Sequence, residues 1–127
     1  GRPLAIGKIN NTFIICLPGN PVSVHLLYGM IIKPFLESLC GAPLIQPRGI
    51  KVTAMFSMKK KNKRMEWLRV NIDNNSENLS VKRYSKQGSG MISSMVFSDG
   101  ILEIPENISY ISKGDRFIFY SFDELFN

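Results

Sequence analysis

Apolar and polar residues follow two different patterns along the chain, and the change comes near Gly41. Before this glycine, residues 12–17 form a short, nearly all-apolar run. Such a run indicates a strand covered on both faces, as in a parallel α/β sheet. A tight turn and a helix follow it. After Gly41, apolar and polar residues alternate in short runs between turn residues, which is typical of antiparallel strands. The predicted fold class is therefore α+β.

The helix carries signals at both ends. Asn20 is a good N-cap, and Pro21 suits the first helical position because its missing N–H would have no partner there. Gly41 is expected just after the last turn. Pro34 lies inside the helix and should kink it or split it. The apolar face is predicted to consist of Val24, Leu27, Ile31, Phe35 and Leu39.

A linker is expected over residues 44–48, which divides the chain into domains 1–46 and 47–127. The second domain should be a small antiparallel barrel or sandwich, because many short strands crowd a short sequence. These strands are predicted at residues 50–58, 65–72, 79–84, 96–97, 101–104 and 116–122.

Composition agrees with a folded protein. Of 127 residues, 44% are hydrophobic and 20% charged, which excludes collagen-like, low-complexity and intrinsically disordered chains. The longest unbroken apolar run, 13–17, is much shorter than the roughly 20 residues of a membrane-spanning helix, so no such helix and no membrane partner are expected. Cys16 and Cys40 are isolated within apolar stretches, which predicts two buried, reduced thiols and a cytoplasmic location. His25, the single histidine, cannot build a multi-histidine metal site.

Charge is spread unevenly. The net charge is +6, with +2 on residues 1–46, +8 on 47–86 and −4 on 87–127. An anionic partner is therefore a reasonable hypothesis. The run Lys59–Arg64 favours a solvated hairpin loop. The alternative is a small basic β-barrel that binds nucleic acid, with Trp67 and Tyr84 as stacking surfaces. A lone tryptophan on a strand is more often part of a core.

The sharpest local feature is Leu17-Pro18-Gly19-Asn20-Pro21-Val22-Ser23, where a strand ends, the chain turns and a helix begins. A helix start can attract an anion through its unpaired N–H groups and its dipole, and ligands of open α/β sheets bind at the carboxyl ends of strands. The same residues also suit a rigid turn with a capping asparagine. Composition does not decide between the two.

This heptapeptide resembles the signature of the MoeA-type molybdopterin molybdenumtransferases, the family that includes the gephyrin E domain. Further segments resemble family blocks in the same order, over nearly the whole chain: Gly1–Lys8, Arg64–Arg69, Gln87–Ser94 and Asp99-Gly100. The resemblance covers about the carboxyl-terminal third of a family member. It implies a strand-loop-helix remnant of the molybdopterin-binding α/β domain (1–46), followed by the small C-terminal β domain of the domain IV type (47–127). The missing start methionine agrees with a chain cut from a longer one.

The resemblance also implies an activity. Family members use adenylylated molybdopterin and molybdate, insert the metal into the dithiolene and release AMP, giving molybdenum cofactor. They need a divalent cation such as magnesium and work as homodimers. Their acidic catalytic and cation-binding residues correspond to sequence upstream of Gly1, so no metal ligand is assigned to this chain, and the chain alone should be inactive. A protein-interaction scaffold is a weaker alternative, since gephyrin binds receptor loops with this fold.

Site residues are implied position by position. Pro18, Gly19, Asn20, Pro21 and Ser23 match the loop that lines the molybdopterin pocket. Arg69 and Ser89 match polar positions of the β domain that face the substrate cleft of the family. Arg2 falls where many members have lysine; because arginine and lysine hold an oxyanion with different geometry, the charge is kept but the role can differ.

Overall fold

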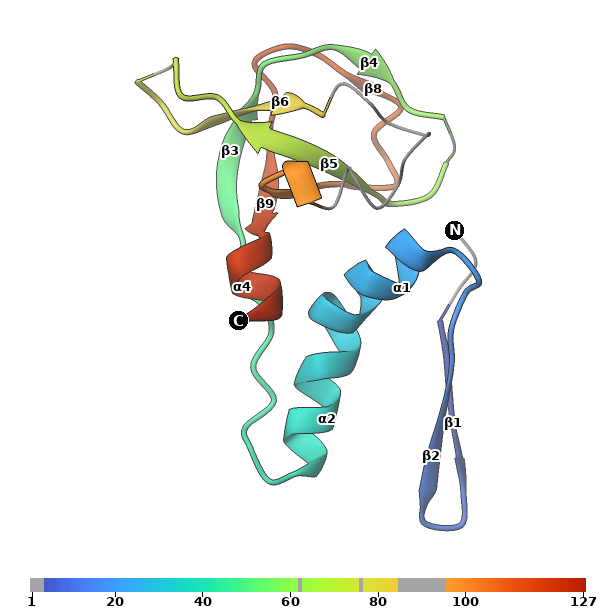
Figure 1. Cartoon of the computed structure of the whole chain (residues 1–127). Helices are drawn as coiled ribbons and strands as arrows, with labels where there is room; N and C mark the ends of the chain where they lie inside the picture. Colours follow the sequence, from blue (N-terminus) through green and yellow to red (C-terminus); the bar gives the residue numbers. More distant parts are fainter. Residues whose placement is uncertain (1–3, 62, 76, 85–95) are drawn as a thin grey trace. The chain divides into compact units, whose positions relative to one another are not determined.

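The computed structural model describes residues 4–61, 63–75, 77–84 and 96–127 (Figure 1). The chain separates into two compact units, residues 1–46 and 47–127.

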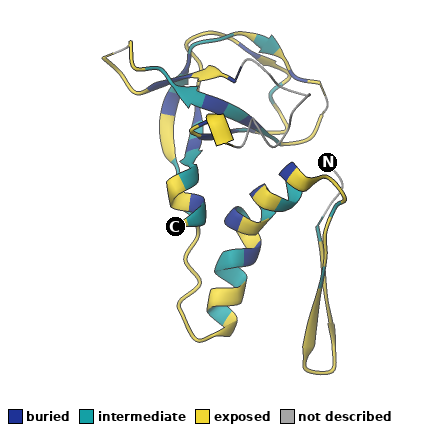
Figure 2. Cartoon of the chain, viewed as in Figure 1, coloured by how far each residue is buried: buried dark blue, intermediate teal, exposed yellow. Residues whose placement is uncertain are grey.

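The first unit begins with a hairpin. Strand β1 (Ala5–Ile9) pairs antiparallel with β2 (Thr12–Cys16), and Asn10 takes a positive φ of 55° in the turn between them. The prediction of a strand covered on both faces in a parallel sheet is therefore wrong. Most of the hairpin is exposed, including Phe13 and Ile14 (Figure 2). An all-apolar run cannot by itself distinguish a two-stranded hairpin from a buried parallel strand, because it does not identify the neighbouring strand.

A helix follows in three parts, α1 (Pro21–Leu27), η1 (Tyr28–Ile32) and α2 (Lys33–Leu39). The middle part is a π-helical turn in which the Lys33 N–H donates to the Tyr28 carbonyl. The turn lies directly before Pro34, whose ring would crowd the carbonyl four residues earlier in a regular α-helix. The predicted interruption at this proline is confirmed. It takes the form of a widened turn, after which the helix continues as α2.

The buried face of this helix differs from the predicted one. Val22, Leu26 and Ile32 are buried, whereas Ile31 and Leu39 of the predicted face are 39% and 51% exposed. Val22 and Leu26 already precede the π-turn, so the helix buries a different side from its first turn onward. Apolar residues lie on several sides of this helix, and their spacing alone could not identify the covered side.

The helix ends as predicted. Gly41 has a φ of 98°, and the Ala42 N–H donates to the Glu37 carbonyl at 3.0 Å, which closes the last turn. The prediction that the cysteines are buried is wrong, because Cys16 and Cys40 are both exposed. Cys40 is the C-cap residue, where the chain leaves the helix, and Cys16 ends a strand of the exposed hairpin.

Taken as one helix of 19 residues, Pro21–Leu39 is long and apolar enough to cross a membrane. No such segment was expected from the sequence, because its longest unbroken apolar run, 13–17, is short. One helix of this kind is weak evidence for a membrane span, because core helices of soluble proteins can have the same length and apolar composition. Within the helix, Lys33 and Glu37 form an ion pair at 2.8 Å.

The second unit contains a closed barrel. Among the described residues its strands follow the order β3-β6-β5-β7-β9 around the barrel. All neighbours pair antiparallel except β3 and β6, which are parallel. The α+β class with a small, mainly antiparallel barrel is confirmed, and the parallel pair was not predicted. The strands are β3 (Ile50–Ala54), β5 (Glu66–Ile72), β6 (Ser80–Arg83), β7 (Gly100–Ile104) and β9 (Arg116–Ser121).

Three details of the barrel depart from the predicted strands. The strand expected over 50–58 stops at Ala54, and its end forms a separate short strand, β4 (Met58–Lys59), paired with β8 (Tyr110–Ile111). Residues 96–97, expected as a strand, are helical. A short helix, α4 (Phe122–Phe126), follows β9 and is capped by the Ser121 hydroxyl, which accepts from the Glu124 N–H at 3.1 Å. Runs of two to five residues are too short for periodicity to assign.

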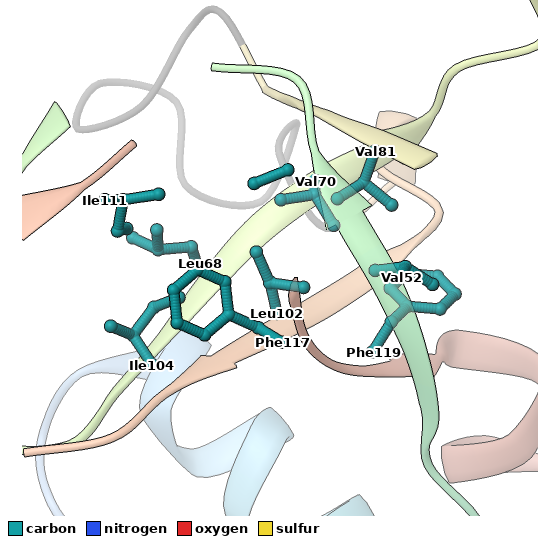
Figure 3. Close-up of a cluster of buried hydrophobic side chains, with 10 residues drawn as sticks. Val52, Leu68, Val70, Val81, Leu102, Ile104, Ile111, Phe117 and Phe119 are labelled. Carbon is teal, nitrogen blue, oxygen red and sulfur yellow. The ribbon is translucent and has the colours of Figure 1, made fainter. Parts of the chain in front are cut away.

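The barrel interior is filled by aliphatic and phenylalanine side chains from every strand of the barrel (Figure 3). Val52, Val70, Val81 and Leu102 are completely buried there. Because side chains alternate along a strand, residues between these positions point to the outer face of the barrel. The outer face therefore carries the functional candidates of this unit.

Candidate functional site

The loop between β2 and α1 contains Pro18, Gly19, Asn20, Pro21 and Ser23, the predicted pocket residues. Asn20 caps the helix, since its Oδ1 accepts from the Val22 N–H at 2.9 Å and the Ser23 N–H at 3.4 Å. Pro21 has no N–H to offer. The first-turn donors that were expected to attract an anion are therefore occupied or absent, and the observed geometry is the rigid capped turn.

Gly19 keeps one property that a ligand site needs. A Cβ atom added at this glycine would have no heavy atom within 4 Å. The backbone of Gly19 is thus open to the approach of a bound molecule, and a Cβ atom there would occupy that space without clashing with the described chain. Its role in binding remains a prediction.

The other predicted site residues are distributed unevenly. Arg2 and Ser89 lie outside the described residues. Arg69 lies on β5 of the second unit, and its side chain is half-buried. The structure therefore groups the residues of the 18–23 loop and places Arg69 in a separate unit.

Arg69 lies in a row of residues on the outer face of the barrel that is formed by three strands and by the residue directly after β6. Arg69 pairs with Ile101 on β7, and Ile101 pairs with Tyr120 on β9. On the other side, the Tyr84 N–H donates to the Arg69 carbonyl at 3.1 Å. We call Tyr84, Arg69, Ile101 and Tyr120 the outer row. Ile101 is fully buried and Tyr84 is only 8% exposed, so the row is much drier than an ordinary outer barrel face.

Burial alters the titration of two members of the outer row. It lowers the pKa of Arg69, because desolvation disfavours the cation, and the nearby Tyr84 acts in the opposite direction by stabilising the charge. Burial also raises the pKa of the Tyr120 hydroxyl, and the Glu103 carboxylate adds to that increase by repelling the phenolate. An arginine held in such surroundings is suited to bind an anionic group, since the interaction is weakly screened there.

Trp67 lies beside the outer row. It pairs with Glu103 across β5 and β7, and its indole N–H donates to Glu103 Oε1 at 3.1 Å. Trp67 is half-buried and Tyr84 is buried. Neither aromatic ring is presented as the open stacking surface that the nucleic-acid alternative requires.

A set of hydrogen bonds at the end of β5 was not predicted from the sequence. Asp99 Oδ2 accepts from the Ile72 N–H at 2.8 Å, and the Asp99 N–H donates to the Val70 carbonyl at 2.9 Å. Asn71 Nδ2 donates to the Phe97 carbonyl at 2.7 Å. These bonds fasten the start of β7 beside the strand that carries Arg69. The only sequence signal was the Asp99-Gly100 turn, which gives no information about its partner strand.

The basic run Lys59–Arg64 is not wholly a solvated loop. Lys60 is only 5% exposed, and its Nζ donates to the Pro105 carbonyl at 2.8 Å. Its backbone N–H donates to the Ser109 carbonyl at 3.0 Å. Lys61 and Lys63 are exposed, as expected. The prediction for Lys60 is wrong because its aliphatic stem can be buried while the ammonium group binds a carbonyl.

A resident metal has no evident site in this part of the molecule. Among residues 4–61, 63–75, 77–84 and 96–127, no three histidine, cysteine, aspartate or glutamate side chains come together as metal ligands. The described residues therefore do not fit a magnesium ion.

Residues 51–122 match the protein family described as the MoeA C-terminal region (domain IV). This match covers more than half of the chain. The chain belongs to the MoeA C-terminal region family. The family match confirms the resemblance found in the sequence, and this match lies in the unit that contains the barrel.

Similar proteins extend the match into the first unit. The chain is 27% identical over 127 residues to the molybdopterin molybdenumtransferase of Haemophilus influenzae, covering 98% of this chain and 31% of that protein. It is 28% identical over 117 residues to molybdopterin molybdenumtransferase 2 of Mycobacterium tuberculosis, covering 91% and 28%.

Solved structures agree with these sequence matches. The molybdopterin biosynthesis moeA protein of Pyrococcus horikoshii OT3 superimposes with a TM-score of 0.67 at 26% identity, over 92% of this chain and 29% of that one. A molybdenum cofactor biosynthesis protein of Pyrococcus furiosus gives 0.66 at 26% identity, over 92% and 40%. The chain thus spans about a third of the length of the proteins that it resembles.

Proposed function

We propose that this chain is the C-terminal part of a molybdopterin molybdenumtransferase. The full-length protein would insert molybdate into adenylylated molybdopterin and release AMP, which gives molybdenum cofactor. The observation that carries the proposal is the combined match: the barrel belongs to the MoeA C-terminal region family, and the two transferases named above align with more than nine-tenths of the chain.

Within that protein, the chain's part would be substrate binding. The 18–23 loop offers an open backbone at Gly19, and Arg69 offers a half-buried guanidinium for an anionic group of the substrate. Ser89 and Arg2 are proposed contacts on the sequence resemblance alone. The catalytic acids and the ligands of a magnesium ion belong, in this proposal, to parts of the full-length protein outside this chain.

The proposal includes a cytoplasmic homodimer, as the sequence resemblance implies. The nucleic-acid alternative is not favoured by the structure, because its two candidate stacking residues are engaged or buried. The 127-residue chain alone is expected to be inactive.

Reconstitution with purified full-length protein tests the function. AMP release from adenylylated molybdopterin should depend on both molybdate and a divalent cation, and the product should activate an apo-molybdoenzyme. The isolated chain, assayed in parallel, should give neither signal. Absence of molybdate-dependent AMP release from a folded full-length protein would refute the proposal.

A further inference from the structure

The connection between the two units, residues 43–47, makes no hydrogen bond with any other described residue. Its first four residues are exposed, and the side chains of Leu44 and Ile45 are among the most exposed apolar ones, at 62% and 70%. The connection begins directly after Ala42, whose N–H closes the preceding helix by donating to the Glu37 carbonyl at 3.0 Å. A backbone segment with few buried contacts and no internal hydrogen bonds can change conformation at little cost.

The chain that leads into β3 passes beside α4, and it becomes fixed there (Figure 1). The Arg48 N–H donates to Glu124 Oε1 at 2.9 Å, and Glu124 lies in the first turn of α4. The helix is itself held in place, because Leu125 is only 1% exposed and the Phe122 N–H donates to the Asp99 carbonyl at 3.0 Å. A hydrogen bond from a backbone N–H to a carboxylate is stronger than one between neutral groups. Helix α4 therefore binds the end of the linker.

The next residue, Gly49, lies against side chains of β9. A Cβ atom added at this glycine would overlap Ile118 Cγ2 and would lie 2.9 Å from Tyr120 Cε1. A larger residue would have to displace these side chains, so glycine allows the backbone to approach β9 closely. Ile50 then pairs with Phe119 and begins the barrel. The two residues before the first barrel strand are thus held by two different elements of the second unit.

We propose that α4 is a clamp on the linker, which holds Arg48 and Gly49 on the barrel and confines free bending to residues 43–47. These five residues span at most about 17 Å when extended, and release of the two clamped residues would add about 7 Å. Pro43 and Pro47 restrict the backbone at both ends of the free segment. Because the length and stiffness of a linker set the effective concentration of two connected units for each other, the clamp would control how readily the units meet. The clamp does not depend on the proposed function.

Backbone nitrogen-15 relaxation of the 127-residue chain tests the clamp. In the wild type, the order parameters of Arg48 and Gly49 should be about 0.85, as in rigid backbone, while those of residues 44–46 should lie below about 0.6. Glu124→Ala removes the acceptor and should lower the values of Arg48 and Gly49 to those of the free segment. Glu124→Gln keeps a side-chain oxygen and should leave them high. Asp123→Ala, which removes the other carboxylate of the same helical turn, is the matched control and should change neither value.

Three results would overturn the inference. The first is a wild type in which Arg48 and Gly49 are as mobile as residues 44–46. The second is a Glu124→Ala variant in which both residues stay rigid, because the helix would then hold nothing. The third is an equal loss of rigidity in Asp123→Ala, since the effect would then follow from damage to α4 and not from the hydrogen bond to Glu124. The measurement needs no substrate, so its result is independent of the activity of the full-length protein.

Discussion

At the scale of single residues, the sequence identified the helix cap, but it did not reveal the hydrogen bonds or the cross-strand neighbours that determine what the site residues can do. Asn20 and Pro21 were recognisable from sequence as the start of a helix, and the structure places the Asn20 side chain on the Val22 and Ser23 N–H groups. The sequence could not show that this cap uses the donors that an anion would need. Cross-strand neighbours such as Arg69 and Tyr84 were equally hidden, because their pairing depends on register between strands.

Replacing Gly19 by valine should disable pterin binding in the full-length protein with only a modest loss of stability. The added Cβ atom meets no heavy atom within 4 Å, so the substitution should occupy the space of a ligand with little effect on the chain's own packing. Isothermal calorimetry measures the affinity, and a thermal melt measures stability. Gly7→Val, on β1, is the control, since a Cβ atom there is also unobstructed. Unchanged affinity in Gly19→Val would remove the 18–23 loop from the site.

Tyr120 predicts a pH dependence of stability at high pH. Its pKa is raised in the folded state, first by burial and then by Glu103, above the ordinary value of 10.0. The unfolded state therefore loses this proton first as pH rises, and the stabilisation is complete below pH 10 and lost as pH passes through the folded pKa. Urea unfolding of wild type and Tyr120→Phe between pH 8 and pH 11 measures the difference. A wild type that loses no more stability than Tyr120→Phe above pH 10 would contradict the assignment.

At the scale of elements, prediction succeeded where a signal was long or chemically specific. The helix ends at Asn20 and Gly41 and the interruption at Pro34 followed from capping and proline chemistry. The parallel β3–β6 pair, the β4–β8 pair and helix α4 did not follow, because short runs carry little periodicity and no information about partners. The basic run shows the same limit. Its charge indicated a solvated loop, whereas Lys60 of this run is buried and binds the carbonyls of Pro105 and Ser109.

Lys60→Ala should destabilise the barrel by about 1–3 kcal/mol, because it removes both the hydrogen bond from Nζ to the Pro105 carbonyl and the packing of a buried side chain. Denaturant unfolding measures this loss. Lys61→Ala removes the same charge from an exposed neighbour and should stay within about 0.5 kcal/mol of wild type. Equal effects of the two substitutions would mean that the buried position of Lys60 contributes nothing.

At the scale of the whole molecule, the two units differ in how far they can stabilise themselves. The barrel of unit 47–127 encloses its own hydrophobic cluster, whereas the hairpin of unit 1–46 exposes most of its apolar residues. The division into an N-terminal strand-loop-helix part and a C-terminal β part could be proposed from the change of pattern near Gly41. The proposed activity could not be derived from pattern at all, and it rests on the sequence resemblance and on family membership.

Residues 47–127 should fold alone, and residues 1–46 should not. A two-stranded hairpin is at best marginally stable in water, and one helix adds too little buried apolar area. The isolated 47–127 segment should show a cooperative thermal transition, while the isolated 1–46 segment should show none. In the whole chain, limited proteolysis should cut first before residue 47. First cuts within 50–122 that spare 12–40 would contradict this account.

The central claim is that the barrel contributes Arg69 to a molybdopterin site, and the affinity of full-length Arg69→Ala for adenylylated molybdopterin tests it most directly. The substitution should weaken binding tenfold or more, about 1.5–3 kcal/mol for a hydrogen bond to a charged group. The melting temperature of the barrel should hardly change, because burial disfavours the Arg69 cation and the substitution leaves the hydrophobic cluster inside the barrel intact. Lys61→Ala should affect neither quantity. If Arg69→Ala instead unfolds the barrel and the protein that remains folded binds substrate normally, Arg69 is structural and the claim is wrong.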